Sequence, residues 1–129
     1  MTQNQKTGAA ANKYGRETAV KIMQALGTTP IDKNTNECIL NGKRVAIKCS
    51  RKYTKCIGVS YRMIERLNQI IGAFETDDNV YDLYQLSPKT FNENMRETKS
   101  KGPAAGRVGL VVQKVFEEQG KFLQSVKIG

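Results

Sequence analysis

The sequence pattern that decides the fold lies in residues 36–50, which read NECILNGKRVAIKCS. Asn41 and Gly42 stand between two strand-like runs, residues 36–40 and 43–49. A two-residue turn of type I′ needs a positive φ at both central positions, and Asn-Gly is a preferred pair for it. We therefore predict an antiparallel hairpin with its turn at these two residues.

A two-residue turn also fixes which residues pair across the hairpin. Leu40 then faces Lys43, and counting outward brings Glu37 opposite Ala46. Because side chains alternate between the two faces of a strand, the hairpin residues fall into two sets. The apolar set, assigned to the core, is Cys38, Leu40, Val45, Ile47 and Cys49, and the other set is Glu37, Ile39, Arg44, Ala46 and Lys48. An acid and a lysine thus share one face at neighbouring diagonal positions, either as a functional pair or as a plain surface ion pair.

The rest of the chain predicts a single domain over residues 13–129, preceded by a disordered arm at residues 1–12. Periodicity and turn signals indicate helices at 14–26 and 61–71, strands at 55–60, 80–86, 108–112 and 122–128, and short helical segments at 88–95 and 114–119. The acidic stretch at 75–78 is interpreted as a solvated turn. We expect an α/β (α+β) fold, a mixed β-sheet flanked by helices in the order αβββαβ with further C-terminal strands.

Composition limits the chemistry that the chain can perform. Its 129 residues include 21 Lys and Arg against 12 Asp and Glu, a net charge of +9, and no histidine. Without histidine, Ser/His and Cys/His catalysis are excluded, and three cysteines are too few for a zinc site made of four thiolates. With no apolar run long enough to cross a bilayer and no signal-peptide core, we expect a cytoplasmic protein with reduced cysteines.

The positive charge is concentrated in two clusters, which favours a polyanionic partner. Six basic residues and no acid lie between positions 43 and 55, and a second cluster surrounds a Gly/Pro/Ala-rich stretch at 102–106. Tyr53 is a candidate for stacking on a base or packing on a sugar, with ordinary packing as the alternative. The residues predicted to contact nucleic acid are Arg44, Arg51, Lys52, Tyr53, Lys55, Lys99, Lys101 and Arg107.

An acidic residue, a hairpin and then a strand of the form acid-x-Lys resembles the active-site motif of the PD-(D/E)XK nuclease superfamily. Glu37 falls at the first acid of that motif, Ala46 at the second, Ile47 at the intervening apolar residue and Lys48 at the lysine. The expected αβββαβ order also matches the superfamily, and the resemblance covers about residues 14–86. It implies a restriction-endonuclease-like core.

The resemblance implies a metal-dependent DNA endonuclease of restriction, homing or junction-resolving type. Mg²⁺, with Mn²⁺ as a substitute, would be held by Glu37 and the backbone carbonyl of Ile47, and Lys48 would be catalytic. Glu17, on the preceding helix, and Glu65 are auxiliary ligand candidates. The partner would be double-stranded or branched DNA, and cutting both strands would require a symmetric homodimer or a larger assembly.

Ala46 departs from the family pattern because alanine cannot bind a metal. Three explanations stay open: a deliberate change that traps an inactive complex, migration of the acid to Glu65, or loss of cleavage with retained binding. The alternative function is accordingly a basic DNA-binding module without activity. A third hypothesis is a basic subunit that docks on an acidic protein.

Overall fold

The computed structural model describes residues 2–32, 35–97 and 108–129. Its elements follow one another as α1 (Thr2–Ala25), β1 (Glu37–Leu40), β2 (Lys43–Ser50), β3 (Cys56–Ser60), α2 (Tyr61–Arg66), β4 (Gln69–Asp77), β5 (Val80–Leu86), α3 (Pro88–Asn94), β6 (Arg96–Glu97), β7 (Val108–Val112), α4 (Gln113–Gln119) and β8 (Lys121–Lys127). The expected class, a mixed sheet flanked by helices, is confirmed. No helix within the described ranges is both long and apolar enough to cross a membrane.

The hairpin forms with the register that the turn predicts. Asn41 has a φ of 53° and Gly42 a φ of 77°, as both central positions of a type I′ turn require. Leu40 pairs with Lys43, and at the other end of the ladder Glu37 pairs with Ala46. The two faces of β1 and β2 therefore carry the two predicted sets of side chains.

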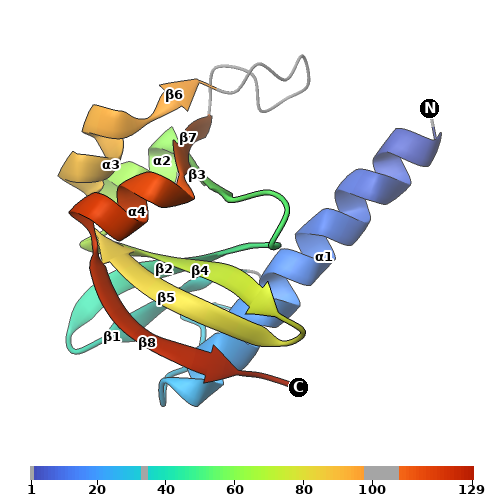
Figure 1. Cartoon of the computed structure of the whole chain (residues 1–129), viewed down its shortest axis with the longest axis horizontal. Coiled ribbons are helices and arrows are strands. Elements are labelled where there is room, and N and C mark those ends of the chain that lie inside the picture. Colours follow the sequence, from blue (N-terminus) through green and yellow to red (C-terminus); the bar gives the residue numbers. More distant parts are fainter. Residues whose placement is uncertain (1, 33–34, 98–107) are drawn as a thin grey trace.

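The strands form two sheets (Figure 1). The larger sheet has the order β1-β2-β4-β5-β8, and the smaller has the order β3-β7-β6. In the larger sheet only β2 and β4 are parallel, and the other neighbours are antiparallel. A parallel pair needs a crossover connection, and here the crossover carries β3 and α2. This connection places α2 and the smaller sheet on one face of the larger sheet.

Each face of the larger sheet is covered by its own hydrophobic cluster. On one face, Ala19, Ile22 and Met23 of α1 pack against the apolar set of the hairpin. On the other face, Ala46 packs in a cluster formed with the smaller sheet and the three short helices. That cluster contains Ala46, Ile57, Val59, Ile64, Leu67, Ile70, Phe74, Leu86, Phe91, Val111 and Phe116. The central strands β2 and β4 are consequently buried on both sides.

Strand β4 was not predicted from the sequence. The helix expected at residues 61–71 ends at Arg66, and β4 begins at Gln69 and continues to Asp77, into the stretch interpreted as an acidic turn. The run from Ile70 to Phe74 is continuously apolar because both faces of the strand are buried, and such a run has no period that separates a strand from a buried helix. The turn itself is confined to the Asp78–Asn79 region, where Asn79 has a φ of 62°.

The third predicted strand forms, but it does not join the hairpin. The expected order αβββαβ counted Val80–Leu86 as its last strand, but the unpredicted β4 precedes that strand in the chain, and β3 pairs with β7 in the smaller sheet. The strand at Val80–Leu86 is confirmed within its predicted bounds, and the short helix α3 begins after Ser87, whose hydroxyl accepts a hydrogen bond from the backbone N–H of Thr90. Strand pairing between segments far apart in the chain is decided by packing, which local patterns do not report.

Helix α1 is longer than predicted. It begins at Thr2, so residues 2–12 are helical where the sequence predicts a disordered arm. This segment contains three alanines and two glutamines, which favour helix, but it lacks the apolar repeat on which the prediction relied. The helix end agrees with expectation, because Gly27 has a φ of 80° just beyond the last turn.

Two glycines of the fold should respond in opposite directions to alanine. A Cβ at Gly72 would lie 2.8 Å from Cε2 of Phe74 and 2.9 Å from Cε1 of Phe116, both buried rings, so Gly72→Ala should destabilise the protein by about 1–3 kcal/mol. At Gly15 in α1 a Cβ meets nothing within 4 Å, and Gly15→Ala should stabilise by up to about 1 kcal/mol. Urea denaturation of both variants checks this, and a Gly72→Ala protein as stable as the wild type would contradict the packing.

Candidate functional site

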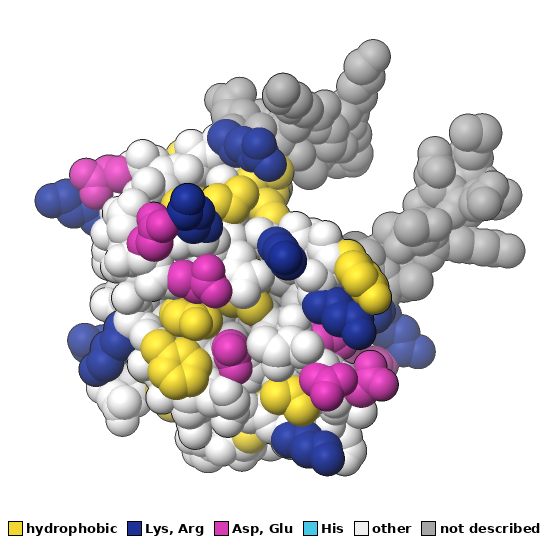
Figure 2. All heavy atoms as spheres, in the orientation of Figure 1, with side chains coloured by type: hydrophobic (Ala, Val, Ile, Leu, Met, Phe, Trp, Pro, Cys, Tyr) yellow, Lys and Arg dark blue, Asp and Glu magenta, His cyan; other side chains and the backbone are white. Residues whose placement is uncertain are grey.

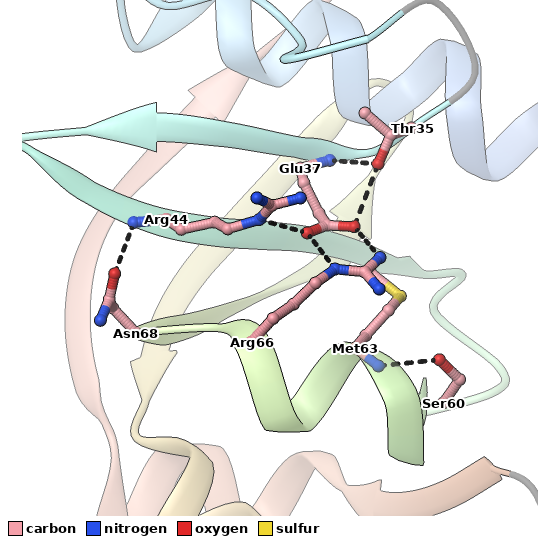
Figure 3. Close-up of polar contacts among 7 residues, drawn as sticks. All are labelled: Thr35, Glu37, Arg44, Ser60, Met63, Arg66 and Asn68. Carbon is pink, nitrogen blue, oxygen red and sulfur yellow. Dashed lines mark hydrogen bonds and ion pairs between the residues drawn. The ribbon is translucent and has the colours of Figure 1, made fainter.

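Glu37 lies at the start of β1 and is buried, with 2% of its side chain exposed. Its Oε1 accepts hydrogen bonds from Nε of Arg44 at 2.8 Å and Nε of Arg66 at 3.0 Å. Its Oε2 accepts from Nη2 of Arg66 and from the Thr35 hydroxyl at 3.2 Å. Figure 3 shows the carboxylate enclosed by these groups. We call Glu37, Arg44 and Arg66 the Glu37 cluster.

Local structure brings Arg66 to this position. Helix α2 begins after Ser60, whose hydroxyl accepts a hydrogen bond from the backbone N–H of Met63 at 3.2 Å. Beyond the helix, Asn68 binds both backbone groups of Arg44, because its side-chain Oδ1 accepts from the Arg44 N–H and its own N–H donates to the Arg44 carbonyl, each at 2.8 Å. The last turn of α2 is thereby held beside β2, and Arg66 reaches Glu37 (Figure 3).

The hydrogen bonds determine the protonation state of Glu37. The bonds from Arg66, and then those from Arg44, outweigh the effect of burial and lower the pKa of Glu37 to about 2. The carboxylate is therefore ionised at neutral pH, and protein donors occupy both of its oxygens. A divalent ion could bind here only by displacing one of these donors.

The three other positions of the resembled motif are buried to different degrees. Ala46 is fully buried in the apolar cluster, so a carboxylate at this position would lack solvent and would adjoin hydrocarbon. Lys48 is partly buried on the same side of β2, and burial lowers its pKa while the nearby Cys49 and Glu37 oppose that effect. The backbone carbonyl of Ile47 accepts a hydrogen bond from Nδ2 of Asn36 at 3.1 Å.

The auxiliary acids predicted from the sequence do not meet Glu37. Glu17 is exposed on α1, which packs on the opposite face of the sheet, and its carboxylate lies 3.9 Å from Nζ of Lys13. Glu65 is exposed on α2. Among the residues that the structure describes, no three acidic or cysteine side chains are grouped so that they could hold a metal ion. The structure therefore brings Glu37 and Lys48 to one side of the sheet but does not assemble the predicted metal ligands around them.

A second candidate region is the β2–β3 loop, residues 51–55. The N–H of Cys56 donates to the Ser50 hydroxyl at 3.3 Å and closes the loop, while the N–H of Lys52 donates to Oε1 of Glu75 at 3.1 Å. The Lys55 carbonyl accepts from the N–H of Gln113 at 2.9 Å. These bonds tie the loop to β4 and to the start of α4, so its conformation is fixed at several points.

The side chains of the loop project outward. Tyr53 is 87% exposed, and Arg51 and Lys55 are also exposed. The Arg51 guanidinium lies over the ring of Tyr14 in α1, 3.8 Å from the ring centre. The Tyr14 hydroxyl in turn is hydrogen-bonded to that of Tyr81 at 2.5 Å, and burial raises the pKa of Tyr14 so that it stays neutral. The loop therefore combines held cations with a solvent-exposed aromatic ring.

The surroundings of this loop are not uniformly basic. Figure 2 shows Lys and Arg side chains interspersed with Asp and Glu over the face seen there. An open hollow of about 640 Å³ adjoins the loop and is lined by Thr54, Lys55, Val112, Gln113, Lys114, Glu117 and Glu118. Because its two glutamates offset its two lysines, this hollow has no preference for an anion.

The second predicted basic region cannot be compared with the structure in the same way. Lys99, Lys101 and Arg107 lie outside the described residues.

Sequence analysis also missed Arg66, which interacts with Glu37 across 29 residues of the chain. Its one signal in the sequence is its position in the helix predicted at residues 61–71.

Comparison with known proteins assigns no family to this chain. No protein-family model matches the sequence, and a search of curated proteins finds no match. The candidate sites are therefore defined by their geometry and charge alone.

The Glu37 cluster predicts a specific dependence of stability on pH. Because folding lowers the pKa of Glu37 from 4.5 to about 2, its contribution, on the order of 3 kcal/mol, is complete above about pH 4.5 and is lost as the pH falls toward 2. Glu37→Gln should therefore be several kcal/mol less stable than the wild type at neutral pH, and this gap should narrow in acid.

Urea denaturation of both proteins at a series of pH values measures that gap. Glu17→Gln serves as the control, since the Glu17–Lys13 pair is exposed and should contribute no more than about 0.5 kcal/mol. A gap for Glu37→Gln that stays constant between neutral pH and pH 2 would contradict the assigned role of the carboxylate.

Proposed function

We propose that this protein binds DNA by its phosphodiester backbone through the β2–β3 loop and does not cleave it. The observation that carries the proposal is the loop itself, in which Arg51, Lys52 and Lys55 surround the exposed Tyr53 on a backbone fixed by hydrogen bonds. Cations of this kind neutralise phosphates, and a held position sets the register of the nucleic acid. Tyr53 supplies a ring on which a base or sugar can pack.

The geometry of the Glu37 cluster supports binding over cleavage. Metal-dependent hydrolysis requires an acid with free oxygens beside Lys48, but both oxygens of Glu37 accept hydrogen bonds from arginine. The buried Ala46 offers no replacement ligand. Of the three explanations for Ala46, this arrangement favours loss of cleavage with retained binding.

We further propose that the chain is a descendant of a PD-(D/E)XK-like nuclease. The order α1-β1-β2-β3-α2-β4 and the lysine on β2 support this proposal. The pairing of β3 with β7 is a departure from a core in which the first three strands share one sheet. Double-stranded and branched DNA are both compatible with contacts made to the backbone.

Removing two lysines of the loop should weaken DNA binding and reduce its dependence on salt. For a duplex, the slope of log K against log salt is about −0.9 per neutralised phosphate. Lys52→Ala/Lys55→Ala should therefore make the slope less negative by about 2. The slope is measured by fluorescence anisotropy of a short labelled duplex that is titrated with protein at several KCl concentrations.

The matched control is Lys89→Ala/Lys121→Ala, which removes the same charge from exposed positions at the other end of the larger sheet. Lys121 pairs with Gln85, near the end of β5. The loop is bonded to Glu75 of β4, which pairs with Tyr81 near the start of β5. The control should keep the wild-type slope. Equal effects of the two double variants would mean that general charge, rather than the loop, attracts DNA.

The absence of cleavage is tested separately. We expect supercoiled plasmid to stay intact when it is incubated with the wild-type protein and Mg²⁺ or Mn²⁺, because the carboxylate of Glu37 is occupied. The control is Lys48→Ala, purified in parallel, which reports any contaminating nuclease. Metal-dependent nicking by the wild type that disappears in Lys48→Ala would overturn the non-catalytic proposal and restore the endonuclease hypothesis.

A further inference from the structure

The Glu37 cluster holds two positive groups unusually close together. Nε of Arg44 and Nε of Arg66 lie 2.8 Å and 3.0 Å from the same oxygen, Oε1 of Glu37. Two guanidinium groups repel each other, so their proximity depends on the carboxylate between them. Figure 3 shows them arriving from different elements, Arg44 from β2 and Arg66 from α2.

The charges of the cluster are arranged with the positive groups toward solvent. The side chains of Arg44 and Arg66 are 39% and 46% exposed, whereas that of Glu37 is only 2% exposed. One carboxylate and two guanidinium groups leave a net charge of +1. Arg44 donates to Glu37 through Nε alone, so within the described part of the chain its terminal nitrogens have no protein acceptor.

The second arginine exceeds what burial of the acid requires. Arg66 alone grips both oxygens of Glu37 through two N–H groups, a bidentate contact that already compensates the buried charge. Arg44 adds a second positive charge on a side chain that is 39% exposed. A buried acid that holds two partly exposed guanidinium groups fixes their positions without neutralising both charges.

We propose that Arg44 and Arg66 form a phosphate-binding site, in which one phosphate group bridges the two guanidinium groups on their solvent side. The planar donor fork of arginine matches the oxygen geometry of phosphate. The existence of the site is independent of the proposed function, but its assignment to a backbone phosphate of DNA rests on that function. A terminal phosphate on a nucleic acid would offer the same chemistry.

The site is spatially distinct from the β2–β3 loop. Arg44 and Arg51 are separated by seven positions along β2 and its extension, roughly 23 Å at the rise of a strand. A single phosphate ion bound at one place therefore cannot touch the other. The two contacts can be tested with separate variants and separate readouts.

The primary test uses inorganic phosphate and the wild-type protein. NMR signals of the arginine Nε–Hε groups are followed during titration at constant ionic strength, with chloride replaced by phosphate. Arg44 and Arg66 should show saturable shifts, and Arg62, exposed on the same helix α2, should not. No shift at either residue, or shifts of all three in proportion without saturation, would overturn the site.

A conservative variant tests the need for the donor fork. Arg44→Lys keeps the charge and leaves the Arg66–Glu37 contact in place, but it lacks the planar fork, so the affinity for phosphate should fall about tenfold. Arg62→Lys should leave the affinity unchanged. Unaltered phosphate binding by a folded Arg44→Lys protein would also overturn the proposal.

Short duplexes with and without a 5′-phosphate identify the source of the phosphate. Equal shifts of Arg44 and Arg66 with both duplexes would assign the site to the backbone, and shifts with only the phosphorylated duplex would assign it to a terminal group. DNA binding through the loop without any response of Arg44 and Arg66 would overturn the assignment of the site to DNA and leave the proposed function standing. A response of Arg44 and Arg66 to inorganic phosphate without any binding of DNA would support the phosphate site and overturn the proposed function.

Discussion

The ion pair between Glu37 and Arg66 joins the first strand of the large sheet to the helix within the β2–β4 crossover. Glu37 is buried but the Arg66 side chain is 46% exposed and Arg44 also bonds the acid, so the loss of Arg66 should cost less than the roughly 3–5 kcal/mol typical of a fully buried pair. The position of α2 over the sheet is thereby constrained from two directions, by the Glu37 carboxylate and by the hydrogen bonds of Asn68 to Arg44. Since α2 follows β3 directly, this constraint also positions the smaller sheet over Ala46.

The same interaction determines what chemistry the acid can perform. A carboxylate that ligates a metal needs oxygens free of other partners, whereas a carboxylate that holds two arginines has none to spare. Lys48 lies on the same side of the strand and is partly buried, which lowers its pKa, but it adjoins an acid that is already neutralised. Stabilising the fold through Glu37 and binding a cation through Glu37 are therefore competing uses of one residue.

Local patterns predicted the hairpin in detail because its information is contained in adjacent residues. The Asn41-Gly42 turn fixes the register, and alternation then assigns Glu37 and Lys48 to one face. The partner of Glu37 was not predictable, since Arg66 is 29 residues away and the contact depends on the path of the crossover. Strand β4 was missed for a different reason, namely that burial on both faces removes the alternation by which a strand is recognised.

Electrostatics distinguish the two uses of the Glu37 cluster without reference to any motif. A site for Mg²⁺ must present excess negative charge, as paired carboxylates do, whereas this cluster carries a net charge of +1 with its acid innermost and its guanidinium groups outermost. A net charge of +1 would repel a divalent cation and attract the phosphate that we propose. In the nuclease descent that we propose, retaining the acid of the hairpin while surrounding it with arginine would convert a site for a cation into a site for a phosphate.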